Sequence, residues 1–276
     1  MKAVGLHSDV FVVTSRVWQT TCTLVKSGDG GSASRSGAGE AFCVDSPVLP
    51  DELDVLPAIA AQASFRVVGC IATHADWDHL LGRYGFPDAP LGLAESSAAR
   101  LRNEPGTAQR ELRDFDEEHY VERPSPLALP GAQALPVPGH CAVGERELEL
   151  HPADGHTVDG MAVFVPWASV LICGDYLSPV EIPWISASGS VSAYQATLSR
   201  LEPLVEQAAH VVPGHGAVLD SARAAALLRE DRAYLSALVE RGADAPLPLT
   251  RRNGAMRKIH RENLERLSTR PTGRGS

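Results

Sequence analysis

The chain has 276 residues, of which 44% are hydrophobic and 21% are charged, so it can bury a substantial core as one large or two small domains. Its formal net charge of −9 argues against phosphate-backbone binding as the main role, because affinity for nucleic acids depends largely on Lys and Arg. Five cysteines without a C-x-x-C pair are typical of reduced core residues. Residues 1–9 contain no continuous apolar stretch, and no segment reaches the ~18 apolar residues of a membrane span. We therefore expect a cytoplasmic protein with no membrane contact and no nucleic-acid partner.

The first third of the chain predicts short strands, at residues 10–13, 20–25 and 41–44. Gly and Ser are frequent in residues 27–39, between the last two strands. Because this stretch lacks the order G-x-x-x-x-G-K-[ST] of a phosphate-binding loop, we interpret it as a flexible hairpin loop. A helix is expected over residues 51–63, disturbed by Pro57, and a buried apolar strand is expected over residues 67–72.

Charged residues are crowded in the middle of the chain, where residues 94–123 predict a helix-rich segment. A solvent-exposed helical face explains this charge better than a binding site does. Residues 124–138 contain five prolines and cannot form a regular helix. We expect them to form an extended crossing between two halves of the fold.

The second half of the chain again alternates strands with helices. Strands are predicted at residues 147–150, 161–165, 170–173 and 210–212. Helices are predicted at residues 192–208, 221–240 and 255–267, and residues 268–276 are expected to be a disordered tail.

Side chains that can bind a metal follow four of the predicted strands. The motifs, in chain order, are His74-Ala75-Asp76-Trp77-Asp78-His79, Gly155-His156-Thr157, Gly174-Asp175 and Pro213-Gly214-His215-Gly216. Imidazole nitrogen and carboxylate oxygen are the ligands that hold Zn²⁺ and similar divalent ions. Each motif also has a structural alternative as a helix cap, a turn or a loop. Four such motifs at strand ends nevertheless favour a metal site, and their seven ligands suit two ions better than one.

With these motifs, the sequence resembles the metallo-β-lactamase fold superfamily of metallohydrolases over about residues 20–216. The pattern of that family is H-x-H-x-D-H, followed by G-H-T, G-D and P-G-H-G, and the motifs occur here in the same order. The resemblance implies an α+β fold, a four-layer αββα sandwich with a dinuclear metal site at the edge of two mixed sheets. It further implies a single domain over residues 1–267, with two halves that cross near residues 124–138 and C-terminal helices at 221–267.

The same resemblance implies a role for each of these residues. Asp175 would bind both of two divalent ions. The other ligands would be His74, Asp76 and His156 for the first ion, and Asp78, His79 and His215 for the second. Asp45, which follows an earlier strand, would support the metal loop by hydrogen bonding.

Asp76 departs from the family pattern, which has His at this position. With two Zn²⁺, three carboxylates and a bridging hydroxide the charges sum to zero, whereas the usual histidine would leave +1. A neutral centre is a weaker Lewis acid, and the added oxygen ligand favours harder ions such as Mn²⁺ or Fe²⁺. Zn²⁺ is still the expected metal, and contact of Asp76 with the metal only through water is a further alternative.

The resemblance implies a hydrolase, in which a metal-bridged hydroxide attacks an ester, lactone, thioester, amide or similar bond of a small molecule. Asp78 and Asp175 would be catalytic by orienting this nucleophile. A di-iron redox enzyme related to the flavodiiron proteins is an alternative, since these also have a carboxylate at the position of Asp76. Only about 60 residues follow His215, however, which is too few for a flavodoxin domain. A non-catalytic metal-binding member is the remaining alternative.

Residues 176–184 after Asp175 are expected to line the substrate pocket. Tyr176 and Trp184 would form aromatic walls and Glu181 an acidic wall, and His260 could point at the site from the last helix. Together they indicate a neutral or partly apolar small molecule as substrate. Core packing explains the aromatic residues equally well, and a packed or surface position is the favoured alternative for His260. The sequence does not indicate an oligomeric state.

Overall fold

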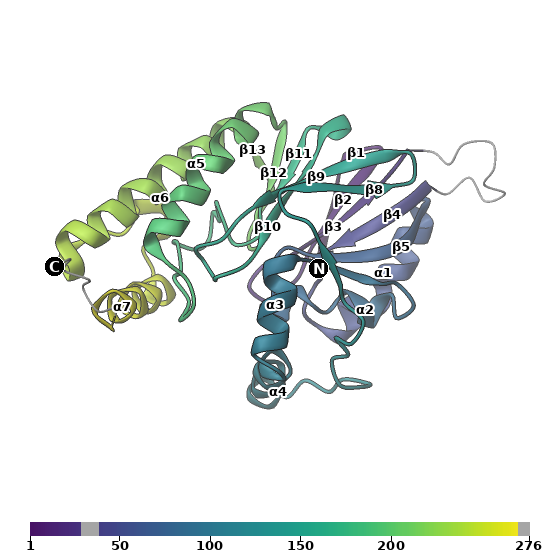
Figure 1. The fold of residues 1–276 in the computed structure, drawn as a ribbon, viewed down its shortest axis with the longest axis horizontal. Helices are drawn as coiled ribbons and strands as arrows, with labels where there is room; N and C mark the ends of the chain where they lie inside the picture. The colour runs from purple at the N-terminus through teal and green to yellow at the C-terminus, as the bar shows by residue number, and fades with distance from the viewer. Residues whose placement is uncertain (29–38, 270–276) are drawn as a thin grey trace.

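The computed structural model describes residues 1–28 and 39–269 (Figure 1). Most of the predicted loop at residues 27–39 and of the predicted tail at residues 268–276 lies outside the described residues. The last helix, α7 (Gly254–Thr269), extends two residues beyond the predicted end at 267.

Seven strands form the first sheet, in the order β1-β2-β3-β4-β5-β6-β7. They are β1 (Lys2–His7), β2 (Val10–Thr14), β3 (Thr21–Lys26), β4 (Gly39–Val44), β5 (Phe65–Ala72), β6 (Leu91–Ala94) and β7 (Gln133–Leu135). The strands from β1 to β4 pair antiparallel and those from β4 to β7 pair in parallel, so the sheet is mixed. Three of the strands were not predicted, because β1 is mostly exposed and β6 and β7 are too short to show a period.

Six strands form the second sheet, in the order β13-β12-β11-β10-β9-β8. They are β8 (Gly139–Val143), β9 (Arg146–Pro152), β10 (Met161–Val165), β11 (Val170–Ile172), β12 (His210–Val212) and β13 (Leu219–Asp220). Only β11 and β12 pair in parallel, so this sheet is mixed as well. The proline-rich segment, residues 124–138, contains β7 of the first sheet and leads directly to β8 of the second.

The helices lie on the outer faces of the two sheets (Figure 1). Those beside the first sheet are α1 (Pro50–Gln62), α2 (Gly82–Gly85), α3 (Glu95–Asn103) and α4 (Thr107–His119). Those beside the second sheet are α5 (Val191–Gln207), α6 (Ser221–Arg241) and α7. Helix α1 continues through Pro57, so the expected disturbance is wrong. Its apolar face, which includes Leu53 and Leu56, is buried against the first sheet and stabilises the helix despite the missing N–H donor.

Successive side chains along each strand point to opposite faces of the sheet, so each sheet contributes to two apolar layers. In β2, Val12 faces the second sheet while Val13 faces the helices of the first half. In β5, Ile71 likewise faces the second sheet and Cys70 faces the helices. One apolar core thus lies between the sheets and one on each outer side, under the helices. The arrangement is a four-layer αββα sandwich, and the predicted fold class is confirmed. No helix of the described residues combines the length and the apolar character needed to cross a membrane.

Leu150 of β9 tests the core between the sheets, because it is 1% exposed there, whereas Leu249 is 82% exposed. We expect Leu150→Ala to lower the free energy of unfolding by about 2–5 kcal/mol, since the deletion leaves a cavity between two rigid layers. The matched control Leu249→Ala is expected to change it by less than about 0.5 kcal/mol. Urea denaturation followed by circular dichroism measures both, and equally small effects would contradict the layered core.

Candidate metal centre

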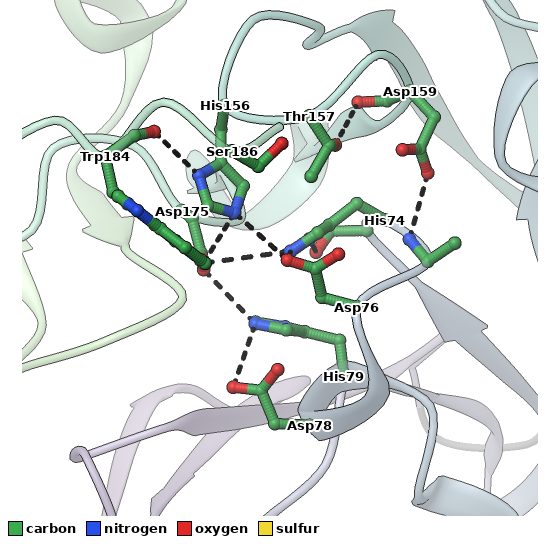
Figure 2. A network of polar contacts seen from close by, with 12 residues as sticks. His74, Asp76, Asp78, His79, His156, Thr157, Asp159, Asp175, Trp184 and Ser186 are labelled. Atoms are coloured by element: carbon green, nitrogen blue, oxygen red, sulfur yellow. Dashed lines mark hydrogen bonds and ion pairs between the residues drawn. The ribbon is translucent and has the colours of Figure 1, made fainter. Parts of the chain in front are cut away.

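The chain segments that carry the predicted ligands meet where β5, β9, β11 and β12 end. Figure 2 shows the ligand side chains that follow β5, β9 and β11. A loop and a single 3-10 turn (Trp77–His79) follow β5 and carry four of the seven ligands. The loop between β9 and β10 carries His156, the turn after β11 carries Asp175, and the turn after β12 carries His215. The structure brings all seven predicted ligands together, in two adjoining clusters.

The first cluster is formed by His74, Asp76, His156 and one oxygen of Asp175. Nε2 of His156 lies 3.3 Å from Asp76 Oδ2 and 3.3 Å from Asp175 Oδ2. Nε2 of His74 lies 3.6 and 3.7 Å from the same two oxygens. Ligands about 2.0–2.1 Å from a tetrahedral ion lie roughly 3.3–3.4 Å from one another, so this spacing suits a bound divalent ion.

The second cluster is formed by Asp78, His79, His215 and the other oxygen of Asp175. Asp175 Oδ1 lies 3.2 Å from Nε2 of His79 and 3.3 Å from Nε2 of His215. Asp78 Oδ2 lies 3.7 and 3.5 Å from the same two nitrogens. The carboxylate of Asp175 therefore presents one oxygen to each cluster, as a group that bridges two ions does.

Unsatisfied atoms in the interior of these clusters also fit a metal. Among the described residues, His74 Nε2, His79 Nε2 and Asp175 Oδ1 are buried without a hydrogen-bond partner. A buried polar atom without a partner costs about 1–3 kcal/mol. A divalent cation in each cluster would satisfy these atoms, His74 Nε2 in the first and the other two in the second, since each can offer a lone pair.

The far side of each histidine ring is engaged by a second group. The partners of Nδ1 are Thr73 Oγ1 for His74 (3.1 Å), Asp45 Oδ2 for His79 (3.1 Å), Trp184 O for His156 (3.0 Å) and Thr20 Oγ1 for His215 (3.3 Å). A carbonyl oxygen only accepts, so His156 donates from Nδ1, and its neutral ring has the free lone pair on Nε2. Such contacts orient a ligand and select its metal-binding nitrogen.

Asp45 lies behind the metal loop, as expected of a supporting residue. Its Oδ1 accepts a hydrogen bond from the backbone N–H of Thr73 (2.7 Å), and its Oδ2 accepts one from the Thr73 hydroxyl (2.9 Å). Because that hydroxyl already donates to Asp45, it can only accept from Nδ1 of His74. Asp45 thereby determines which nitrogen of His74 faces the first cluster.

Arg100 and Asp159 belong to the site, although the sequence analysis missed both. Nη1 of Arg100 donates to Asp76 Oδ1 at 2.7 Å and to Asp159 Oδ1 at 3.0 Å. Burial alone would lower the pKa of Arg100, but the carboxylates of Asp76 and Asp159 raise it, so the guanidinium stays charged. Arg100 falls in the charged helical segment that the sequence analysis assigned to solvent, and no motif marks Asp159.

The sequence matches the family model described as the metallo-beta-lactamase superfamily over residues 16–236. The chain belongs to the metallo-β-lactamase superfamily. No curated protein matches the chain.

Several solved structures share the fold at low sequence identity. The family protein TTHA1429 from Thermus thermophilus is 20% identical with a TM-score of 0.66, over 95% of this chain and 93% of that chain. TTHA1623, solved in a di-iron-bound form, is 23% identical with a TM-score of 0.59, over 78% and 97% of the two chains. The sec-alkylsulfatase Pisa1 from Pseudomonas sp. is 14% identical with a TM-score of 0.70, over 99% of this chain but only 50% of its own.

Of the predicted pocket residues, Trp184 and Glu181 lie beside the two ligand clusters. Both line a hollow that His156 and Asp175 also line. The Trp184 ring centre lies 5.3 Å from that of His156, and Trp184 is 36% exposed. Burial raises the pKa of the Glu181 carboxyl, and the negative charge of Asp175 raises it further. An aromatic and an acidic group thus adjoin the site.

The side chains of Tyr176 and His260, the other two predicted pocket residues, contact groups of the protein. Tyr176 is only 2% exposed, and its hydroxyl accepts a hydrogen bond from the backbone N–H of His156 (3.1 Å), so it supports the ligand loop from the interior. Nδ1 of His260 lies 3.0 Å from the hydroxyl of Tyr234 on α6. Contact of either residue with a substrate stays a prediction.

Arg251 and Asn263 hold the loop that carries Glu181 and Trp184. Arg251 is buried and donates from Nη1 to the carbonyl of Glu181 at 2.7 Å. Asn263 donates to the carbonyl of Pro183 at 2.7 Å and accepts from the backbone N–H of Ile185 at 2.8 Å. Helix α7 and the residues before it thereby position this side of the site.

An aromatic cluster that the sequence analysis did not single out lies near the second ligand cluster. The ring centres of Trp18, Trp77 and Phe115 lie 4.8–5.5 Å from one another. Trp18 is 47% exposed, and the residue after it, Gln19, accepts a hydrogen bond from the backbone N–H of Gly216 (3.0 Å). The turn between β2 and β3 therefore adds an exposed aromatic ring near His215.

Gly214 gives a test of the shared carboxylate. A Cβ at this position would lie 2.1 Å from Asp175 Oδ1 and 3.0 Å from His79 Cε1. We expect Gly214→Ala to displace Asp175 and to reduce the bound metal by at least one ion per chain, measured by elemental analysis after dialysis. Gly254→Ala is the control, because no atom lies within 4 Å of its Cβ. Equal metal content in both variants would contradict the geometry.

Metal uptake should release protons. In the metal-free protein, burial alone would lower the pKa of His156 and His215. Asp76 and Asp175 nevertheless raise it to about 9 for His156, and Asp175 and Glu181 raise it to about 10 for His215. Near pH 7 both rings hold a proton that a metal must displace, so the apparent affinity should rise from pH 7 toward pH 9. Isothermal titration of Zn²⁺ in buffers of different ionisation enthalpy measures the release, and an enthalpy independent of buffer would contradict it.

Proposed function

We propose that this chain is a hydrolase that binds two divalent ions and cleaves an ester, lactone, thioester, amide or similar bond of a small molecule. The observation that carries the proposal is the divided carboxylate of Asp175, which faces His156 with one oxygen and His79 with the other. Two complete ligand sets on either side of one carboxylate support two ions at short separation. Membership of a superfamily that includes hydrolases supports the reaction class.

His74, Asp76 and His156 would hold the first ion, Asp78, His79 and His215 the second, and Asp175 both. Ions held in this way lower the pKa of water toward about 7 and polarise a carbonyl or phosphoryl oxygen of the substrate. The chain itself contributes the orientation of these groups. Asp78 and Asp175 lie at the clusters and would accept a hydrogen bond from the attacking water, which aligns it with the bond to be cleaved.

Zn²⁺ is the proposed metal, and Mn²⁺ or Fe²⁺ are the alternatives. Each cluster combines imidazoles with carboxylate oxygens, which suits zinc, whereas an oxygen of Asp76 in place of an imidazole shifts the first cluster toward harder ions. Arg100 places a positive charge beside Asp76, which it shares with Asp159.

The surroundings of the clusters support a neutral or partly apolar substrate. Trp184 offers an exposed aromatic ring and Glu181 an acidic group, whereas the cation Arg100 is already bound to two carboxylates. An anionic substrate would find repulsion at Glu181. A small-molecule substrate without nucleic acid fits this arrangement, and the cytoplasmic location stays a prediction.

A di-iron redox enzyme is the second candidate. The relative TTHA1623 was solved in a di-iron-bound form, and Asp76 supplies an oxygen ligand of the kind that iron accepts. Iron as the metal of protein purified without added metal would favour this function over hydrolysis.

Elemental analysis together with a hydrolysis panel tests the proposal. We expect two zinc ions per chain in the wild type and one in Asp76→Ala, because the first cluster loses a ligand. Asp54→Ala is the control, since Asp54 is exposed on α1. Cleavage of an ester, lactone, thioester or amide should fall about 100-fold in Asp76→Ala.

Protein that keeps two ions and cleaves none of these bonds would contradict the hydrolase and favour a non-catalytic metal-binding role. Unchanged metal content in Asp76→Ala would show instead that Asp76 reaches the metal only through water.

A further inference from the structure

Arg100 is a largely buried basic residue beside the first cluster, and it contacts two carboxylates. It lies on α3 with 12% of its side chain exposed, and its Nη1 contacts Asp76 and Asp159 together. Its Nε lies 3.4 Å from Glu104 Oε2, one helical turn further on. One guanidinium thus pairs with two carboxylates that are largely buried, and the removal of such a partner is strongly unfavourable.

The hydrogen bond from Arg100 gives the two oxygens of Asp76 different partners. Oδ1 accepts from Arg100 at 2.7 Å, while Oδ2 lies 3.3 Å from Nε2 of His156 and 3.6 Å from Nε2 of His74. Because Oδ1 is held by a charge-assisted hydrogen bond, only Oδ2 is presented to the cluster. Asp76 is thereby restricted to one donor atom, as an imidazole is.

The contact also joins the two loops that supply the first cluster. Asp159 belongs to the β9–β10 loop that carries His156, and its Oδ2 accepts the backbone N–H of Ala75 at 3.0 Å (Figure 2). Arg100 connects that same Asp159 to Asp76 on the β5 loop. Ala75, Asp76, Arg100 and Asp159 therefore form a closed ring of contacts.

We propose that Arg100 is the positioning residue that allows an aspartate to serve at a ligand position where the family pattern has histidine. It places a positive charge against Asp76, leaves Asp76 a single donor oxygen, and holds Asp76 at the distance from His156 that one ion requires. This inference rests on the proposed two-metal function and adds how the first ion is held. A merely structural ion pair between α3 and Asp159 is the competing explanation.

The two explanations differ in what happens when Asp76 becomes histidine. If Arg100 acts through Asp76, it has no role beside a neutral imidazole, and its positive charge there opposes a cation. If Arg100 only fixes α3 to Asp159, its loss has the same effect whichever residue stands at position 76. A double-mutant cycle separates these cases.

The experiment measures Zn²⁺ binding to the metal-free protein by competition with a chelator. We expect Arg100→Met to weaken one of the two binding steps by about 10–100-fold, the range found for residues that orient metal ligands. In the Asp76→His background, Arg100→Met should leave that step unchanged or strengthen it. Arg200→Met is the matched control, since Arg200 pairs with Asp154 in the same β9–β10 loop and is 38% exposed.

Equal loss in both backgrounds, or no loss in either, would overturn the proposal. Urea unfolding of each metal-free variant separates loss of fold from loss of metal. Should Arg100→Met not fold, Arg100→Lys keeps the charge but not the two-way contact, and the same background dependence is expected of it.

Failure of the inference can be distinguished from failure of the proposed function. Wild type that binds two ions but hydrolyses no substrate contradicts the function alone, because the cycle is read from binding. Wild type that hydrolyses while Arg100→Met binds both ions normally contradicts the inference alone. Wild type that binds fewer than two ions contradicts both, before any variant is compared.

Discussion

The carboxylate of Asp175 is the contact on which the arrangement of the site depends. It lies at the end of β11 in the second sheet, yet its Oδ1 lies 3.2 Å from His79, which follows β5 of the first sheet. The two sheets must therefore pack so that these strand ends meet. Gly214 makes the approach possible, because a Cβ at that position would lie 2.1 Å from Asp175 Oδ1. The backbone N–H of Gly214 also donates to Gly174 (2.6 Å), which joins the turn after β12 to the turn after β11.

Because these strand ends meet, several carboxylates are buried close together, and their negative charge needs nearby positive groups. Burial alone would raise the pKa of Asp76, but hydrogen bonds from His156 and His74 hold it well below its ordinary value. Asp76 is therefore an anion, and Arg100 provides the opposite charge on its outer side. Where the family pattern has a neutral ligand, this chain thus combines a charged one with a cation from a different element.

The loop that carries Glu181 and Trp184 is held by α7 and the residues before it. Arg251, Asn263 and α7 hold the loop with Glu181 and Trp184 through backbone groups of that loop. The carbonyl of Trp184 in turn accepts from Nδ1 of His156 at 3.0 Å. This loop and the candidate ligand His156 are therefore coupled, so a change in α7 can reach the first cluster through one carbonyl. This coupling explains why Asn263 is buried in a helix that is otherwise mostly exposed.

The sequence by itself determined the fold class and the seven candidate ligands that the structure brings together, because side chains placed directly after buried strands converge wherever those strand ends meet. It did not reveal the short strands β6 and β7 or the exposed β1, since so few or mostly exposed residues show no period. The tertiary structure alone decided the division of Asp175 between the clusters and the contacts of Arg100 with Asp76 and Asp159. Arg100 lies 24 positions from Asp76 and 59 from Asp159, in a helix whose charges indicate solvent. Its partners are set by the packing of α3 against the metal loops, and local sequence carries no record of an ion pair that only folding brings together.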